Sequence, residues 1–481
     1  MTFFRPTQSL IKVLLLGLII FGCNKNNQVP DSNIDLTIFF INDYHSQIDN
    51  FSKIKHIIDQ ERQQTNVLVV GGGDIFSGSP VVDYHPEKGY PMIDMMNRVG
   101  FDVAVLGNHE FDYGEEILKD RFEQAKFVWV CANVDMGSTD VPQPLPYKTI
   151  TIGDSKITFL GLIETNGKQD DIIPSTHPWR VQNFVFERPE NVVGQYSNLK
   201  ETENADLLIA LTHLGFDGGD RNLGDSQLAQ QFPYFDLIIG GHSHQKINAI
   251  VNDIPIVQAG SYLNYLGKVE LSVKQKSIAS INYELIDLNI YSDFDAELKA
   301  IIDEYNDLPY LSEVVGNSQV YHERSQVGCF VADALQGRMA VDVSFQNGGG
   351  VRSDLNEGDI TKREIYEISP FNNGTVIYSM SVLEIKEFLI GTGSGFYYSG
   401  IQIIQDERDV IIKDINGSTL TNDVILTVGV LDYIAAVNDS YFPPNGAIQD
   451  LNDAETIISY LETINSEVNY QNCSRYFRFQ Y

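Results

Sequence analysis

The stretch GNHEFDYG, residues 107–114, decides how the rest of the chain is interpreted. It follows the apolar run 103–106, which predicts a buried strand. Ligand sites in open α/β sheets lie beyond the carboxyl ends of the strands, so this polar cluster stands where a site is expected. Asp112 lies three residues after His109, and such an Asp can hold a His in the tautomer that a general acid or base requires. By itself, the stretch is equally compatible with an ordinary capped turn.

Four other apolar runs end in polar clusters of the same construction. They are residues 36–41, followed by NDYH; residues 67–70, followed by GGGD; residues 207–211, followed by THLG; and residues 237–239, followed by GGHSH. Runs that are apolar on both faces predict a sheet covered by helices on both sides. Five such ends in sequence order predict one rim of ligand-type side chains, which five unrelated capped turns would not explain.

Seven side chains at these strand ends have the chemistry of metal ligands. They are Asp43, His45, Asp74, Asn108, His213, His242 and His244. Carboxylate, imidazole and amide oxygen ligands, without a thiolate, suit Zn²⁺, Mn²⁺ or Fe²⁺. Seven ligands are too many for one ion and suit two, about 3.5–4 Å apart, which together clamp the oxygens of a phosphoryl group during hydrolysis. Outside these motifs lie four histidines that we expect to be ordinary surface or core residues: His56, His85, His177 and His322.

Length and charge limit the class of protein. A chain of 481 residues exceeds what one core usually supports, so two domains are expected. The net charge is -32, from 33 Lys+Arg against 65 Asp+Glu. This balance argues against a nucleic acid polymer as partner, because a phosphate backbone needs a basic footprint. A small anionic substrate stays compatible with it, since bound divalent cations invert the local field.

The N-terminus has the features of an export signal. Arg5 and Lys12 precede the apolar run 13–21, which is too short to span a bilayer, and Gly22-Cys23 follows. This arrangement resembles the lipobox of bacterial lipoproteins, although Phe21 is bulky for one. We therefore expect a signal peptide over residues 1–22 and a lipid anchor on Cys23, which would place the protein in the cell envelope, periplasmic or at the cell surface. Secretion without an anchor is the alternative.

The remaining cysteines give no sign of a disulfide framework or zinc site. Cys131, Cys329 and Cys473 are an odd number without close spacing. Cys131 and Cys329 lie in apolar runs and are expected to be buried spacers, and Cys473 carries no expectation.

The pattern along the chain predicts the domain boundaries. Residues 23–33 are polar and typical of a tether, and residues 34–290 hold the five strand ends. Residues 291–317 contain an amphipathic helix, predicted over 293–305, that links the domains. Residues 318–481 form the second domain, with a capping box at Ser381 and Glu384 opening a helix. We find no internal repeat.

Taken together, the five motifs resemble those of the calcineurin-like metallophosphoesterases. Their spacing and the C-terminal half resemble the 5′-nucleotidase branch, which includes UDP-sugar hydrolases and 2′,3′-cyclic-nucleotide phosphodiesterases. The resemblance implies an α/β protein with an αββα sandwich domain, followed by a smaller α+β substrate-binding domain. It implies one ion held by Asp43, His45 and His244, another by Asn108, His213 and His242, and Asp74 bridging both. It also implies that His109, steadied by Asp112, contacts the phosphoryl oxygen or the leaving group.

In that branch, the second domain binds the nucleoside. By motif match, Asn347 and Arg352 contact the substrate, Phe371 and Tyr433 sandwich the base, and Asp439 contacts the ribose. Two departures put the identity of the substrate in doubt. A stretch that usually carries one or two well-placed arginines offers only Arg324, in a shifted position, and the usual glycine-rich turn before the acid is Val437-Asn438.

The sequence therefore predicts an envelope-anchored, two-metal phosphoesterase that hydrolyses 5′-nucleotides. A phosphodiesterase for 2′,3′-cyclic nucleotides or UDP-sugars is an alternative of the same class. A surface module that only binds metal or nucleotide is an alternative of another class, although it would not need the dyad of His109 and Asp112. A metallopeptidase is disfavoured because the sequence has no His-Glu-x-x-His motif. The oligomeric state cannot be predicted from these patterns.

Overall fold

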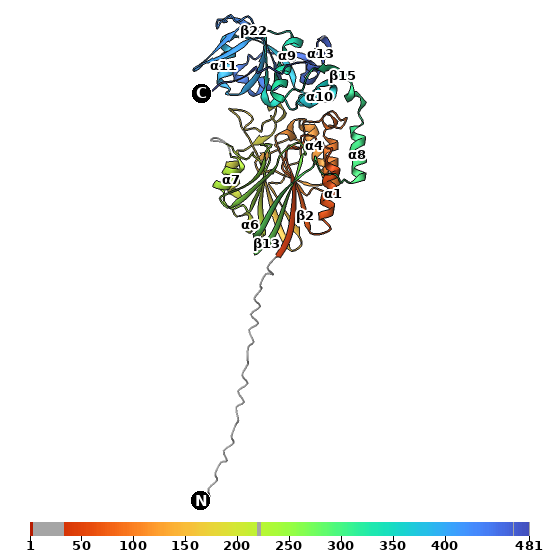
Figure 1. Ribbon diagram of the computed structural model, residues 1–481. Coiled ribbons are helices and arrows are strands. Elements are labelled where there is room, and N and C mark those ends of the chain that lie inside the picture. The colour runs from red at the N-terminus through yellow and green to blue at the C-terminus, as the bar shows by residue number, and fades with distance from the viewer. Residues whose placement is uncertain (3–32, 219–222, 465, 481) are drawn as a thin grey trace.

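The computed structural model describes residues 1–2, 33–218, 223–464 and 466–480. The predicted signal peptide, apart from residues 1–2, and the lipidation site Cys23 lie outside these residues. The chain forms two α/β domains, with the second domain (cyan to blue) stacked on one end of the first (Figure 1). None of the described helices is long and apolar enough to cross a membrane.

The first domain contains two six-stranded sheets. In spatial order, the first sheet consists of β14 (Ser277–Asp287), β13 (Tyr265–Lys274), β1 (Asn33–Ile41), β2 (Asn66–Gly71), β3 (Val103–Val105) and β4 (Val128–Val130). The second consists of β11 (Lys246–Val251), β12 (Ile254–Ala259), β10 (Leu237–Ile239), β9 (Leu207–His213), β7 (Ser155–Ile163) and β6 (Tyr147–Ile152). The strands at the centre of each sheet are parallel, so their carboxyl ends point the same way within it.

The two sheets pack face to face, and helices cover only their outer faces. Ile38 and Phe40 of β1 pack against residues of β9 and β10 in one buried cluster between the sheets. Outside the first sheet lie α1 (Phe51–Glu61), α3 (Tyr90–Val99) and α4 (Glu115–Gln124), and outside the second lie α6 (Leu199–Thr202) and α7 (Asp225–Gln231). The αββα sandwich implied by the resemblance is confirmed. The prediction of one sheet covered by helices on both sides is wrong, because a second sheet removes a strand face from water as well as a helix does.

Short elements fill the connections of the first domain. They are α2 (Pro80–Asp83), α5 (Pro189–Val192) and the two-stranded pair β5 (Val134–Asp135) and β8 (Val185–Phe186). On α3, Met92, Met95, Met96 and Val99 are all buried and form an apolar stripe.

The linker helix α8 (Ala296–Asn306) lies along the first domain (Figure 1). The Asp295 carboxylate accepts the backbone N–H of Leu298 at 2.8 Å and so caps the helix. Leu298 and Ile302 are buried, and Lys55 of α1 lies 3.2 Å from Asp295. Packing and this ion pair hold α8 to the first domain.

The second domain has one mixed sheet with helices around it. The sheet order is β23 (Ala447–Asn452), β18 (Gly374–Ser381), β22 (Ile425–Leu431), β16 (Val343–Asn347), β19 (Gly395–Ser399) and β24 (Tyr476–Arg478). The helices are α9 (Arg324–Met339), α10 (Lys362–Ile368), α11 (Val382–Gly391), α12 (Asp432–Val437) and α13 (Asp453–Thr463). Two small pairs complete it: β15 (Val314–Ser318) with β17 (Gly358–Thr361), and β20 (Gln402–Asp406) with β21 (Asp409–Lys413). The predicted capping box opens α11, with reciprocal Ser381–Glu384 hydrogen bonds of 2.7 and 3.2 Å.

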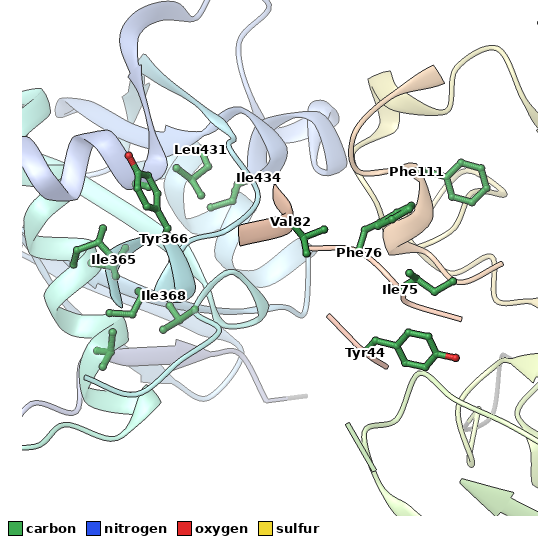
Figure 2. Packing of buried hydrophobic residues seen from close by; sticks show 14 of the residues in the cluster. Tyr44, Ile75, Phe76, Val82, Phe111, Ile365, Tyr366, Ile368, Leu431 and Ile434 are labelled. Carbon is green, nitrogen blue, oxygen red and sulfur yellow. The ribbon is translucent and has the colours of Figure 1, made fainter. Parts of the chain in front are cut away.

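Apolar packing continues from one domain into the other beside the candidate site. Figure 2 shows Val82 of α2 between Phe76 of the first domain and Ile365 and Ile368 of α10 in the second. The rings of Tyr84 and Tyr366 lie 4.4 Å apart across the same contact. The arrangement of the domains is therefore supported by buried side chains and not by the linker alone.

A disulfide joins Cys329 of α9 to Cys473, across 144 residues of sequence. The expectation that Cys329 is a buried spacer is therefore wrong, and the pairing was invisible because two cysteines so far apart in sequence meet only in the fold. Cys131 is free and buried, as predicted.

Candidate metal centre and active site

All seven predicted ligands come together at one end of the sandwich. Asp43 and His45 follow β1, Asp74 follows β2, and Asn108 follows β3, all from the first sheet. His213 ends β9, and His242 and His244 follow β10, from the second sheet. The site thus lies where the carboxyl ends of both sheets meet, so each sheet supplies about half of it.

The ligands form two groups that share one residue. Asp43, His45, Asp74 and His244 form one group, and Asp74, His213 and His242 form the other; within each group the ligand atoms lie within 4.8 Å of one another. The carboxamide oxygen of Asn108 lies 3.0 Å from Nδ1 of His242 and so adjoins the second group. Asp74 stands where a ligand that bridges two ions is required.

Hydrogen bonds aim one ring nitrogen of His45 and one of His213 into this cluster. Nδ1 of His45 lies 3.1 Å from the Ser77 carbonyl oxygen, and Nδ1 of His213 lies 2.7 Å from that of Gly72, so each Nδ1 carries the proton. The Nε2 atoms then face the cluster, that of His45 toward Nε2 of His244 at 2.9 Å and that of His213 toward Asp74 at 3.1 Å. Lone pairs and carboxylate oxygens at such distances fit divalent cations between them.

The pKa shifts point the same way. Burial, reinforced by the neighbouring Asp74 carboxylate, outweighs the effect of His213 and raises the pKa of Asp43 to about 7. Burial, reinforced by Arg352, lowers the pKa of His244 to about 3 and keeps that imidazole neutral and able to bind metal. Burial alone would lower the pKa of His213, but the Asp74 carboxylate raises it to about 10. The proton that Asp74 favours on Nε2 of His213 is the one that a bound cation would displace.

The backbone of the site adopts a conformation that most residues avoid. Positive φ angles occur at Asp43 (53°), His45 (48°), Asp74 (56°), His242 (76°) and His244 (55°). Such strain persists where the surrounding structure imposes it, and it concentrates at functional sites. Gly107 permits the closest approach here, since a Cβ on it would stand 2.3 Å from the Asp74 carboxylate.

Two buried carboxylates that the sequence analysis did not assign hold these loops in place. Glu110 accepts the backbone N–H groups of Asp74 at 3.1 Å and Ile75 at 2.6 Å, and it also accepts that of Gly107. Asp225 accepts from Thr212 at 2.6 Å, next to His213. Glu110 stands inside the GNHEFDYG stretch, and the need to satisfy the backbone N–H groups of a glycine-rich loop was the available signal for it.

The predicted dyad is formed. Nδ1 of His109 lies 2.6 Å from one carboxylate oxygen of Asp112, whose other oxygen accepts the Thr176 hydroxyl at 2.8 Å. Burial by itself lowers the pKa of His109, but the carboxylates of Asp74 and Asp112 outweigh it and raise that pKa above its usual value. Nε2 of His109 lies 3.8 Å from Asp74, so the free ring nitrogen faces the metal cluster.

A cavity of about 220 Å³ lies over the cluster and is lined by both domains. From the second domain come Asn347, Arg352, Phe371 and Tyr433. Arg352 reaches across the interface, with Nη2 3.1 Å from Nε2 of His45. The Phe371 ring stacks on His109, with 5.4 Å between centroids and 14° between planes.

Two residues of the predicted substrate set are placed elsewhere. Asp439 does not line this cavity; it borders a separate one of about 660 Å³ and accepts from Lys168 of the first domain at 2.8 Å. Arg324 donates to the Val351 carbonyl oxygen at 2.8 and 3.1 Å. Its guanidinium therefore holds the loop that carries Arg352, which leaves it a structural contact in this arrangement.

His177 and Arg180 line the cavity, although the sequence analysis did not place them in the site. His177 was expected to be a surface or core residue; it is buried and has Nε2 3.5 Å from Asp432 of the second domain. The core expectation fits His322, whose ring accepts the backbone N–H of Tyr470 at 2.8 Å. Side chains of this kind gain their place from contact with the other domain, which local sequence does not reveal.

Comparisons with known proteins agree with this geometry. Residues 36–246 match the calcineurin-like phosphoesterase family, and residues 310–443 match the 5′-nucleotidase C-terminal domain. The chain therefore has a calcineurin-like phosphoesterase domain followed by a 5′-nucleotidase C-terminal domain, and the calcineurin-like family uses divalent metal ions. Its second domain places it with the 5′-nucleotidase and UshA relatives, which are hydrolases.

Individual relatives are similar over most of this chain. Protein UshA of Yersinia enterocolitica is 26% identical over 90% of this chain and 92% of its own. The endonuclease YhcR of Bacillus subtilis is 25% identical over 93% of this chain, which spans only 41% of that relative's length. The 5′-nucleotidase precursor of Thermus thermophilus has the same fold, with a TM-score of 0.80 at 21% identity over 92% of this chain and 98% of that one.

Proposed function

We propose that this protein hydrolyses 5′-nucleotides to nucleoside and phosphate at a centre that holds two divalent ions. The observation that carries the proposal is that the two ligand groups sharing Asp74 face Arg352, Phe371 and Tyr433 across one cavity. Bound ions would supply Lewis acidity to the phosphoryl group. A guanidinium such as that of Arg352 fits a phosphate by its fork of donors, and the aromatic rings fit any base by stacking.

Side chains of this protein would supply proton transfer and the exclusion of water. His109, oriented by Asp112, holds a proton at the edge of the ligand cluster and can transfer it to the leaving oxygen or stabilise a phosphoryl oxygen. The buried loops around Asp43 and Asp74 keep water from the carboxylates, which strengthens the electrostatic interactions at the site.

Substrate entry requires a rearrangement of this interface. The cavity of about 220 Å³ is smaller than the roughly 300–1,000 Å³ of typical small-molecule pockets, and Phe371 covers His109. We infer that the domains part, or that Phe371 moves, before a nucleotide binds, as closure and opening steps do in many enzymes.

We place the protein in the cell envelope, anchored by lipid at Cys23. The predicted signal peptide supports export, and the Cys329–Cys473 disulfide supports an oxidising compartment outside the cytoplasm. Incorporation of labelled palmitate into the full chain, lost in Cys23→Ser, tests the anchor; unchanged incorporation would contradict it.

The first prediction concerns the reaction. The protein without its first 22 residues is expected to release phosphate from nucleoside 5′-monophosphates faster than from non-nucleotide phosphomonoesters. The measurement is phosphate release across a panel that includes 2′,3′-cyclic nucleotides, UDP-sugars and p-nitrophenyl phosphate. A clear preference for the cyclic nucleotides or UDP-sugars would contradict the proposal and establish the phosphodiesterase alternative.

The second prediction concerns the aromatic pair. Phe371→Ala combined with Tyr433→Ala is expected to raise KM for a nucleotide by roughly 10-fold or more, because stacking on each ring contributes about 1–3 kcal/mol. Hydrolysis of p-nitrophenyl phosphate, which has no base, should change little. Equal losses on both substrates would show that the rings are core residues, and no loss on either would show that the second domain does not hold the base.

A further inference from the structure

Arg180 makes contacts on both sides of the domain interface. It ends the short helix Pro178–Arg180, which packs on α12 of the second domain. Its Nη1 atom lies 3.6 Å from the Asp112 carboxylate, an ion-pair contact within the first domain. Its Nη2 atom donates to the backbone carbonyl oxygen of Phe371 in the second domain at 3.0 Å. One side chain thus touches both the catalytic dyad and the residue proposed to stack on the base.

On the side of the dyad, Arg180 completes the surroundings of Asp112. One carboxylate oxygen of Asp112 pairs with His109, and the other accepts from Thr176 and lies beside Arg180. Because the carboxylate is buried and held from both sides, its orientation sets that of the His109 ring. A partner of this kind orients the group that reacts without touching the substrate itself.

In the second domain, Phe371 contacts both Arg180 and the dyad. Its backbone is held by Arg180, and its ring lies flat against His109. A planar guanidinium has donors in a fixed fork, so it can satisfy a carboxylate and a carbonyl at the same time, which a lysine ammonium does less well. Any movement of Phe371 that admits a base therefore breaks or re-forms its hydrogen bond with Arg180, the side chain that steadies Asp112.

We propose that Arg180 is a positioning residue that couples binding of the base by Phe371 to the orientation of the His109–Asp112 dyad. The proposal rests on the proposed function, in that Phe371 stacks on the base. It assigns to the first domain a determinant of nucleotide specificity, because the side chain that steadies Asp112 also binds the backbone carbonyl oxygen of Phe371, a contact that Phe371→Ala retains.

The test compares Arg180→Met with Thr176→Val. Both variants remove a partner of Asp112, but Arg180 also donates to the Phe371 carbonyl oxygen of the second domain, whereas the Thr176 hydroxyl donates to Asp112. With p-nitrophenyl phosphate, each variant is expected to lose roughly 10-fold in kcat. With AMP, Thr176→Val should show the same loss in kcat/KM, whereas Arg180→Met should lose roughly 10-fold more. Arg180→Lys should also lose more activity on AMP than on p-nitrophenyl phosphate. It serves as the second variant should Arg180→Met fail to fold. Metal content and melting temperature check that each variant is intact.

Two results would overturn the coupling. Equal losses on AMP and p-nitrophenyl phosphate in both arginine variants would show that Arg180 acts on the dyad alone. A higher KM for p-nitrophenyl phosphate at unchanged kcat would show that Arg180 binds the phosphate directly. The Phe371→Ala plus Tyr433→Ala variant separates this failure from that of the proposed function. If that variant loses activity selectively on the nucleotide and Arg180→Met does not, only the coupling fails. If that variant loses no activity on either substrate, the second domain does not hold the base, and the part of the proposed function on which the coupling rests fails.

Discussion

Asp74→Asn is expected to abolish the binding of both metal ions and to lower turnover by on the order of 10³-fold or more, since Lewis-acid stabilisation contributes several kcal/mol. Asp74 is the residue common to the two ligand groups. Asparagine keeps its shape, tolerates the left-handed φ of 56° at this position, and can still accept the His109 backbone N–H, which lies 2.9 Å away. The charge is the property that changes, so the loss reports the need for a bridging carboxylate.

Asp43→Asn is the matched control for this prediction. Asp43 has a similar φ of 53° and is also fully buried, but it belongs to one ligand group only. Elemental analysis of undialysed protein should find about two ions per chain in the wild type, about one in Asp43→Asn and fewer in Asp74→Asn. A single ion in active wild-type protein, or two in Asp74→Asn, would rule out the bridged pair.

Most of the candidate metal centre could be predicted because its chemistry is local. Each ligand stands within a few residues of a strand end, and the order of the motifs limits how the strand ends can meet. His213, for example, is in place as soon as β9 is, since it is the last residue of that strand. The grouping of the ligands into two sets around Asp74 was implied by the resemblance and is matched by the distances.

The division of the strands between two sheets could not be predicted from the residues alone. Strands such as β2 and β10 are apolar on both faces whether a helix or another sheet covers them. The edge strand β14 also escaped notice: Ile281, Tyr283 and Leu285 alternate with polar residues, but the strand is short of strongly apolar side chains and none of its residues is fully buried. Its place depends on ten residues of pairing with β13, which is a property of the register and not of its own composition.

Contacts between the domains were the least accessible from sequence. His177 and Arg180 stand in a stretch without a motif, and they become part of the site only because α12 docks beside the helix Pro178–Arg180. Asp439 shows the converse, since its motif match is local but its side chain pairs with Lys168 outside the cavity over the ligands. A local pattern identifies what a residue can do, and the docking of the domains decides where it does it.

His109→Ala is expected to keep both ions and yet lower turnover by roughly 10²–10⁴-fold, as expected for the loss of an acid–base group. The ring nitrogens of His109 face Asp112 and Asp74, and its backbone N–H, which alanine retains, is the part that donates to Asp74. Metal analysis and kcat on the same preparation make the measurement. Loss of the ions along with activity would show that His109 is itself a ligand.

Two further comparisons define what His109 does. The double variant His109→Ala with Asp112→Asn should be little worse than His109→Ala alone, because Asp112 acts through His109 and residues that work as a unit are not additive. If His109 protonates the leaving oxygen, the loss should be larger for a nucleotide, whose alkoxide is a strong base, than for p-nitrophenyl phosphate, whose phenolate leaves unaided. Equal losses would assign the ring to a phosphoryl oxygen, where charge forms with either substrate. An additive double variant would contradict the dyad, because it would mean that Asp112, 2.6 Å from Nδ1, works independently of the ring it orients.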